Sequence, residues 1–183
     1  MLTEQSAAYG FDGGADVQYH FDLSGEGPAP QVIVGGNLAQ KNAMEIAQVN
    51  VAKREYQKLY MDYWNSTAEL TGTGRPVDAV LCAAAAHAAV IPTQYVHVGY
   101  TSFLNLLDYT GVVFPVTNAD KAVDVAQRES FLSELDERSY RGYDAEVYDG
   151  APAGVQLFGR RLQEEKLLVL AEYVSAAVAG ASA

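Results

Sequence analysis

Three short apolar runs constrain the fold of this 183-residue chain more than any other feature, and they lie at residues 77–81, 112–114 and 154–158. None has the strict polar–apolar alternation of a half-exposed strand, so each is typical of a strand buried on both faces. Segments with the helical spacing of apolar residues lie around them, at residues 38–65, 100–109, 128–138 and 162–178. This order predicts an α/β fold in which helices cover a sheet.

Some element boundaries follow from capping residues and breakers. Asn37 can cap the long helix of residues 38–65. Pro115 either ends the second strand or sits at a position that donates no ladder hydrogen bond. Residues 83–89 are ambiguous, although their alanines favour a helix, and the alternation at residues 19–22 is compatible with an edge strand.

The chain has the size and composition of one globular domain, which we expect to span residues 1–183. Hydrophobic residues make up 49% of it, and the formal net charge is −11. A field of that sign repels phosphate backbones and anionic lipid, which argues against nucleic-acid and membrane-surface binding. The sequence opens with no secretory signal, contains no apolar run long enough to cross a bilayer, and has a single cysteine, Cys82. We therefore expect a cytoplasmic protein.

A series of motifs follows the chain from residue 11 to its C-terminal region. The shorter motifs are Phe-Asp-Gly-Gly-Ala-Asp-Val at 11–17, Asn-Val-Ala-Lys-Arg at 50–54, His-Ala-Ala-Val at 87–90 and Gly-Tyr-Thr at 99–101. The longer motifs are Trp-Asn-Ser-Thr at 64–67, Thr-Gly-Thr-Gly-Arg-Pro-Val-Asp-Ala at 71–79 and Gly-Ala-Pro-Ala-Gly-Val-Gln-Leu-Phe-Gly-Arg-Arg-Leu at 150–162. In this order they resemble the C-terminal portion of the amidase-signature family, of the fungal acetamidase type.

The resemblance implies a truncated amidase-signature fold, with a mixed sheet covered by helices and walls of an acyl-binding channel. It also implies an extended loop at residues 83–89. The family hydrolyses amides with a serine, a second serine on a cis peptide and a lysine, all in its N-terminal half. This chain contains no Ser-Ser pair, and it has Cys-Ala-Ala-Ala-Ala-His at residues 82–87, where the family tends to have prolines. We therefore assign no hydrolytic residue.

The other chemistry-bearing side chains give little sign of a site of their own. His20, His87 and His97 show no metal-ligand spacing, so we expect no metal and no cofactor. No serine stands in a Gly-x-Ser-x-Gly turn, and Thr101 or Ser102 is better explained as the N-cap of the helix that follows.

An aromatic and polar cluster remains between residues 87 and 109. Its members are His87, Tyr95, His97, Tyr100, Phe103, Asn105, Asp108 and Tyr109. Such residues can line a small-molecule pocket, because they combine apolar area with a few fixed hydrogen-bonding groups. They can equally be core and interface residues whose hydroxyls are satisfied.

Two functions of different classes stay open. In the first, a degenerate amidase-fold protein has lost amide hydrolysis and binds a small molecule or catalyses a cyclase- or isomerase-like step in fungal secondary metabolism. In the second, the chain is a subunit or fragment of an amide hydrolase that needs an N-terminal partner. Either function leaves a sheet edge and an apolar face to be covered, in a homodimer or an obligate heterocomplex.

Overall fold

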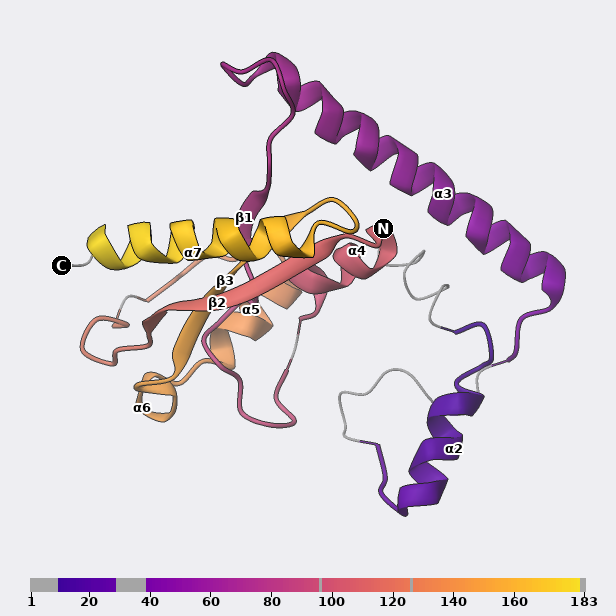
Figure 1. Cartoon of the computed structure of the whole chain (residues 1–183). Helices are drawn as coiled ribbons and strands as arrows, with labels where there is room; N and C mark the ends of the chain where they lie inside the picture. The colour runs from indigo at the N-terminus through magenta and orange to yellow at the C-terminus, as the bar shows by residue number, and fades with distance from the viewer. Residues whose placement is uncertain (1–9, 29–38, 96, 126, 182–183) are drawn as a thin grey trace. The chain divides into compact units, whose positions relative to one another are not determined.

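The computed structural model describes residues 10–28, 39–95, 97–125 and 127–181, and it has two compact units, Met1–Val77 and Asp78–Ala183 (Figure 1). The expectation of one domain over residues 1–183 stays a prediction. All the residues of the predicted aromatic and polar cluster belong to the second unit.

The first described helix, α2, spans Ala15–Ser24 and includes residues 19–22, so the edge strand expected there is wrong. Local capping explains the helix. The Asp12 carboxylate accepts hydrogen bonds from the backbone N–H groups of Gly14 and Asp16, each at 2.9 Å. These contacts supply acceptors at the helix start, and they lower the pKa of Asp12. The short polar–apolar alternation at residues 19–22 does not outweigh these capping hydrogen bonds.

The long helix, α3, spans Ala43–Ser66 and begins five residues later than predicted. Asn42 caps it in a reciprocal capping box, in which its side chain accepts from Met44 and Glu45 while the Glu45 carboxylate accepts from the Asn42 N–H. The cap expected at Asn37 lies outside the described residues.

The end of α3 is tied to the chain that follows it through Val77. The indole of Trp64, which is buried, donates to the Val77 carbonyl at 3.0 Å, and the Val77 N–H donates to the Thr67 hydroxyl at 3.0 Å. Thr67 opens a short 3-10 helix, η1, at Thr67–Glu69. Because both backbone groups of Val77 are used in this way, the strand expected from residue 77 begins only at Val80.

The sheet of the second unit has the order β1-β3-β2, with β1 at Val80–Ala83, β2 at Thr110–Asn118 and β3 at Pro152–Gly159. Both pairings are antiparallel, so in the described residues the expected mixed sheet is antiparallel throughout. Pro115 lies inside β2 beside a register irregularity and does not end the strand. An outer strand tolerates a residue without an N–H, which agrees with the second alternative for Pro115.

Helices pack on both faces of the central strand. On one face Leu157 of β3 forms a core cluster with Leu167 and Ala171 of α7, which spans Glu164–Ala181 and lies along the sheet (Figure 1). On the other face Phe158 meets Phe103 of α4 at a ring separation of 5.3 Å. Successive strand residues point to opposite faces, so β3 is covered on both sides.

The outer strands are less covered than their apolar sequences predicted. Along β1 and β2 half-buried residues alternate with exposed ones, and only β3 carries a run of buried side chains. Three helices complete the unit, α4 at Gly99–Leu107, α5 at Glu134–Arg141 and α6 at Ala145–Tyr148. Residues 84–89 form an irregular loop and not a helix, and its Ala89 N–H donates to the Pro152 carbonyl at 2.9 Å.

A single buried amide joins the central strand to β1 and to helix α4. Gln156 of β3 is 1% exposed, and its side chain lies on the α4 face, as Phe158 does. Its Nε2 donates to the Tyr100 carbonyl in the first turn of α4 and to the Ala83 carbonyl at the end of β1, with the sulfur of Cys82 at 3.2 Å. The buried amide therefore satisfies partly buried acceptors on two elements at once.

We predict that Gln156→Leu lowers the free energy of unfolding of the chain by about 1–3 kcal/mol, because it leaves the partly buried Ala83 and Tyr100 carbonyls without their donor. Urea unfolding followed by circular dichroism measures this loss. Gln48→Leu, at an exposed position of α3, is the control and is expected to stay within about 0.5 kcal/mol of the parent. Equal stability of the two variants would contradict the assigned role of Gln156.

Candidate functional site

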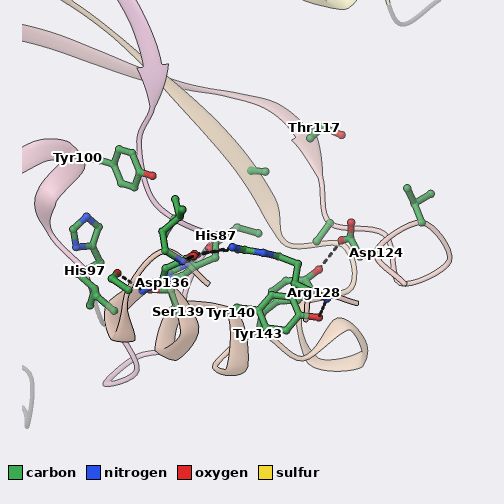
Figure 2. Close-up of a pocket in the computed structure, with 18 of the residues that line it drawn as sticks. His87, His97, Tyr100, Thr117, Asp124, Arg128, Asp136, Ser139, Tyr140 and Tyr143 are labelled. Atoms are coloured by element: carbon green, nitrogen blue, oxygen red, sulfur yellow. Dashed lines mark hydrogen bonds and ion pairs between the residues drawn. The ribbon is translucent and has the colours of Figure 1, made fainter. Parts of the chain in front are cut away.

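The second unit contains a cavity of about 810 Å³ (Figure 2). Its walls come from the loop after β1, the start of α4, the end of β2, the segment after β2, and α5. The lining residues are Ala86, His87, Ala88, His97, Tyr100, Thr117, Asn118, Ala119, Val123, Asp124, Arg128, Leu132, Ser133, Leu135, Asp136, Ser139, Tyr140, Tyr143 and Ala153. Segments far apart in sequence therefore meet at one hollow.

Three of the eight residues expected from sequence line this cavity, namely His87, His97 and Tyr100. His97 stands edge-to-face on Tyr100, with ring centroids 5.4 Å apart. The imidazole lies so close to Gly99 that a Cβ there would collide with its ring atoms. Glycine at position 99 therefore permits the packing of His97 at the entry to α4.

The hydrogen bond of His87 fixes where its proton lies. Its Nδ1 is 2.7 Å from the Ala88 carbonyl, and since a carbonyl only accepts, Nδ1 carries the hydrogen. In the neutral imidazole Nε2 is then an acceptor. The ring is held by Tyr95 and Tyr148, whose centroids lie 5.9 and 6.2 Å away.

Tyr95 and Phe103 lie outside the lining of the cavity. Tyr95 packs edge-on against His87, and its partial burial raises the pKa of the phenol above its ordinary value. Phe103 is a core residue through its contact with Phe158. Both residues therefore have ring contacts outside the lining.

Asn105, Asp108 and Tyr109 also lie outside the lining of the cavity. Asn105 is exposed on α4, and Asp108 ends that helix in the left-handed conformation, with φ 58°, while pairing with Arg161 at 2.7 Å. Burial raises the pKa of Tyr109, and the charge of Arg160 partly offsets this. A binding role for any of the eight residues stays a prediction.

The N-cap expected at Thr101 or Ser102 is wrong. Helix α4 begins at Gly99, and its N-cap residue is Val98, which has no side chain able to cap. Thr101 and Ser102 lie within the helix, where their backbone N–H groups both donate to the Val98 carbonyl. The glycine needed beside His97 sets the start of the helix ahead of the two hydroxyl residues.

The opposite wall was not expected as part of a site. Arg128 and Asp136 form a two-point ion pair, with Nη1–Oδ1 at 3.0 Å and Nη2–Oδ2 at 2.7 Å. The guanidinium also lies over the rings of Phe131 and Tyr140, at 5.2 and 5.7 Å. The Arg128 hydrogen bond lowers the pKa of Asp136, with help from the Leu132 N–H. These contacts hold the loop before α5 against the first turn of that helix.

The same contacts explain why the helix expected at residues 128–138 begins at Glu134. The Ser133 hydroxyl accepts from the Asp136 N–H and caps the helix. The residues before Ser133 adopt a non-helical backbone, because only then can Arg128 reach Asp136. No short-range spacing in the sequence indicates this pair, whose members stand eight residues apart.

A second carboxylate of the cavity is paired with a tyrosine. The Tyr143 hydroxyl donates to Oδ2 of Asp124 at 2.6 Å. This hydrogen bond, with some burial and the nearby charges, raises the pKa of Tyr143 to about 12. In Figure 2 His97 and Tyr100 lie toward one end of the cavity, and Thr117 and Asp124 lie toward the other.

The cavity therefore combines aromatic faces, hydroxyl groups, an imidazole acceptor and three charged side chains, which suits the binding of a small polar molecule. In the described ranges, no group of three or more His, Cys, Asp or Glu residues is placed to hold a metal ion. Across these same ranges, no helix is long and apolar enough to cross a membrane.

Comparisons with known proteins agree on one family. The sequence model of the Amidase family matches residues 34–168. An acetamidase of Aspergillus oryzae is 43% identical over 91% of this chain, and an acetamidase of Emericella nidulans is 40% identical over 92%. The chain spans only 31% of the length of each of these relatives. In fold it is similar to a fatty acid amide hydrolase, with a TM-score of 0.74 and 21% identity over 96% of this chain and 32% of the other.

The pairing of Tyr143 with Asp124 predicts an alkaline titration. A raised pKa means that the contact stabilises the folded chain fully below pH 10 and that this contribution is lost as pH rises from 10 toward about 12. The difference in absorbance at 295 nm between the parent and Tyr143→Phe should titrate near pH 12. In an Asp124→Asn background the same difference should titrate at lower pH, and an unchanged curve would contradict the pairing.

Proposed function

The chain belongs to the amidase family, and from this premise we propose that its unit Asp78–Ala183 supplies a small-molecule-binding cavity and does not hydrolyse amides by itself. The observation that supports this proposal most directly is the cavity of about 810 Å³, a size that suits a small organic ligand. Tyrosine and histidine rings provide apolar area around a few polar groups there, which is how such sites orient a ligand.

The residues of the cavity support a non-hydrolytic role. The sequence has no Ser-Ser pair, and no lysine is among the residues that line the cavity in the described part of the chain. Two serines line the cavity, Ser133 and Ser139, and the Ser133 hydroxyl is engaged as the cap of α5. A cyclase- or isomerase-like step in fungal secondary metabolism stays a prediction, for which His97 or Tyr100 would be the candidate general acid.

A second candidate function is amide hydrolysis together with a complementary chain. Identity of 43% to the acetamidase of Aspergillus oryzae, over only 31% of its length, favours it. Outer strands also support a partner, because Leu81 of β1 is 47% exposed and Val113 of β2 is 58% exposed. Such a surface fits a two-fold dimer of this chain or an obligate heterocomplex.

Calorimetric titration with three four-carbon probes tests the proposed cavity, using butanamide, butylammonium and butanoate. At least one probe should bind, and Tyr100→Ala should weaken that binding by about three- to tenfold, since an aromatic contact contributes about 0.5–1.5 kcal/mol. Asn105→Ala is the matched control on the same helix, outside the lining. Failure of all three probes to bind would overturn the proposal.

Co-expression tests the second candidate. The chain would be produced with the remainder of the Aspergillus oryzae acetamidase, meaning the part of that protein outside its match to this chain. Light scattering after size exclusion and ammonia release from acetamide would be measured. A mixed complex that releases ammonia is expected if the chain completes an amide hydrolase. A mixed complex without turnover, or no complex at all, would contradict this candidate, and the chain alone is expected to give no turnover.

A further inference from the structure

The charges that line the cavity do not cancel. With histidines counted as neutral, the lining carries two carboxylates, Asp124 and Asp136, and one guanidinium, Arg128. One negative charge is therefore in excess at the cavity. Which carboxylate carries it follows from the contacts of the three groups.

Arg128 is already committed to Asp136. Two hydrogen bonds of 3.0 and 2.7 Å join the pair, and a second Nη2 contact reaches the Ser130 carbonyl at 3.4 Å. The Leu132 N–H adds a further donor to Asp136 at 2.9 Å. A carboxylate ligand would have to displace Asp136 from this two-point geometry to use the guanidinium. The cavity therefore offers no ready site for an anion.

Asp124 carries the excess charge. Its Oδ2 accepts from the Tyr143 hydroxyl at 2.6 Å and from the Asp120 N–H at 3.3 Å, and both donors are neutral groups. Within the described residues Asp124 takes part in no ion pair. A carboxylate has about four acceptor positions on its two oxygens, so Asp124 keeps capacity for another donor.

The groups next to Asp124 also favour a cationic ligand that donates hydrogen bonds. Tyr143 lines the cavity with its aromatic ring, and such rings attract organic cations, whereas the ring of Tyr140 is already covered by the Arg128 guanidinium. The hydroxyl of Tyr143 gives its hydrogen to Asp124 and keeps its lone pairs, and Nε2 of His87 is an acceptor whenever that ring is uncharged. Acceptors and ring faces suit an ammonium group, which has three hydrogens to donate and one charge to balance.

We propose that the cavity selects ligands bearing a primary ammonium group over neutral and anionic ligands of the same size, with Asp124 as the counter-ion. The selectivity rests on the proposed small-molecule function of this cavity. The net charge of −11 on the chain adds to it, because the field raises the local concentration of cations.

The three four-carbon probes distinguish the outcomes when titrated at 20 mM salt. Butylammonium should bind at least about fivefold more tightly than butanamide, and butanoate should bind most weakly. Asp124→Asn should bring the ratio of butylammonium to butanamide affinity close to one. Asp120→Asn is the matched control, since this exposed carboxylate lies four residues away, accepts a backbone hydrogen bond and does not line the cavity. It should keep the preference.

The parent chain alone supplies an independent measurement. Raising the salt from 20 to 200 mM should weaken the binding of butylammonium and leave that of butanamide nearly constant, because only the charged ligand is screened. Equal affinities of the three probes, or a preference that survives in Asp124→Asn, would overturn the ammonium selectivity while leaving the binding function intact. No binding of any probe would remove the proposed function and the selectivity together.

Discussion

The arrangement of the second unit depends on one buried amide in its central strand. Gln156 stands between two elements that have no ladder hydrogen bond to each other, the first turn of α4 and the end of β1. A hydrophobic residue there would provide no donor for the Tyr100 carbonyl at the start of α4. Since Tyr100 provides the carbonyl that Gln156 binds, the amide also fixes the end of the cavity where His97 and Tyr100 lie.

The same strand separates structural from site-forming chemistry. On the α7 face, Leu157 packs with Leu167 and Ala171 in an apolar cluster. On the α4 face, Gln156 and Phe158 hold the helix that carries cavity residues. A two-residue period therefore lets a single strand build the core and position the site, with neither function interrupting the other.

Sequence patterns predicted the elements well where local physics decides them. Apart from the short helix α6, the order of helices and strands in the second unit follows from apolar runs and helical spacing, and β2 and α7 lie where these indicated. Boundaries failed where a distant partner decides. The strand expected from Val77 starts late because Trp64 and Thr67 occupy its backbone groups. A second boundary failed for a local reason: the helix expected from residue 38 starts at Ala43, where Asn42 and Glu45 form a capping box.

The cavity shows the same limit more sharply. Its first wall was found because His87, His97 and Tyr100 lie within a short aromatic segment. The second wall was missed because Arg128 pairs with Asp136 and Asp124 with Tyr143 across a stretch whose polar composition indicates only surface. A sequence cannot distinguish such an ion pair or carboxylate–hydroxyl contact from solvated side chains. The second wall is held by its own polar contacts, and the first is held by Gln156 and by ring packing. A ligand that spans the cavity would therefore contact both walls.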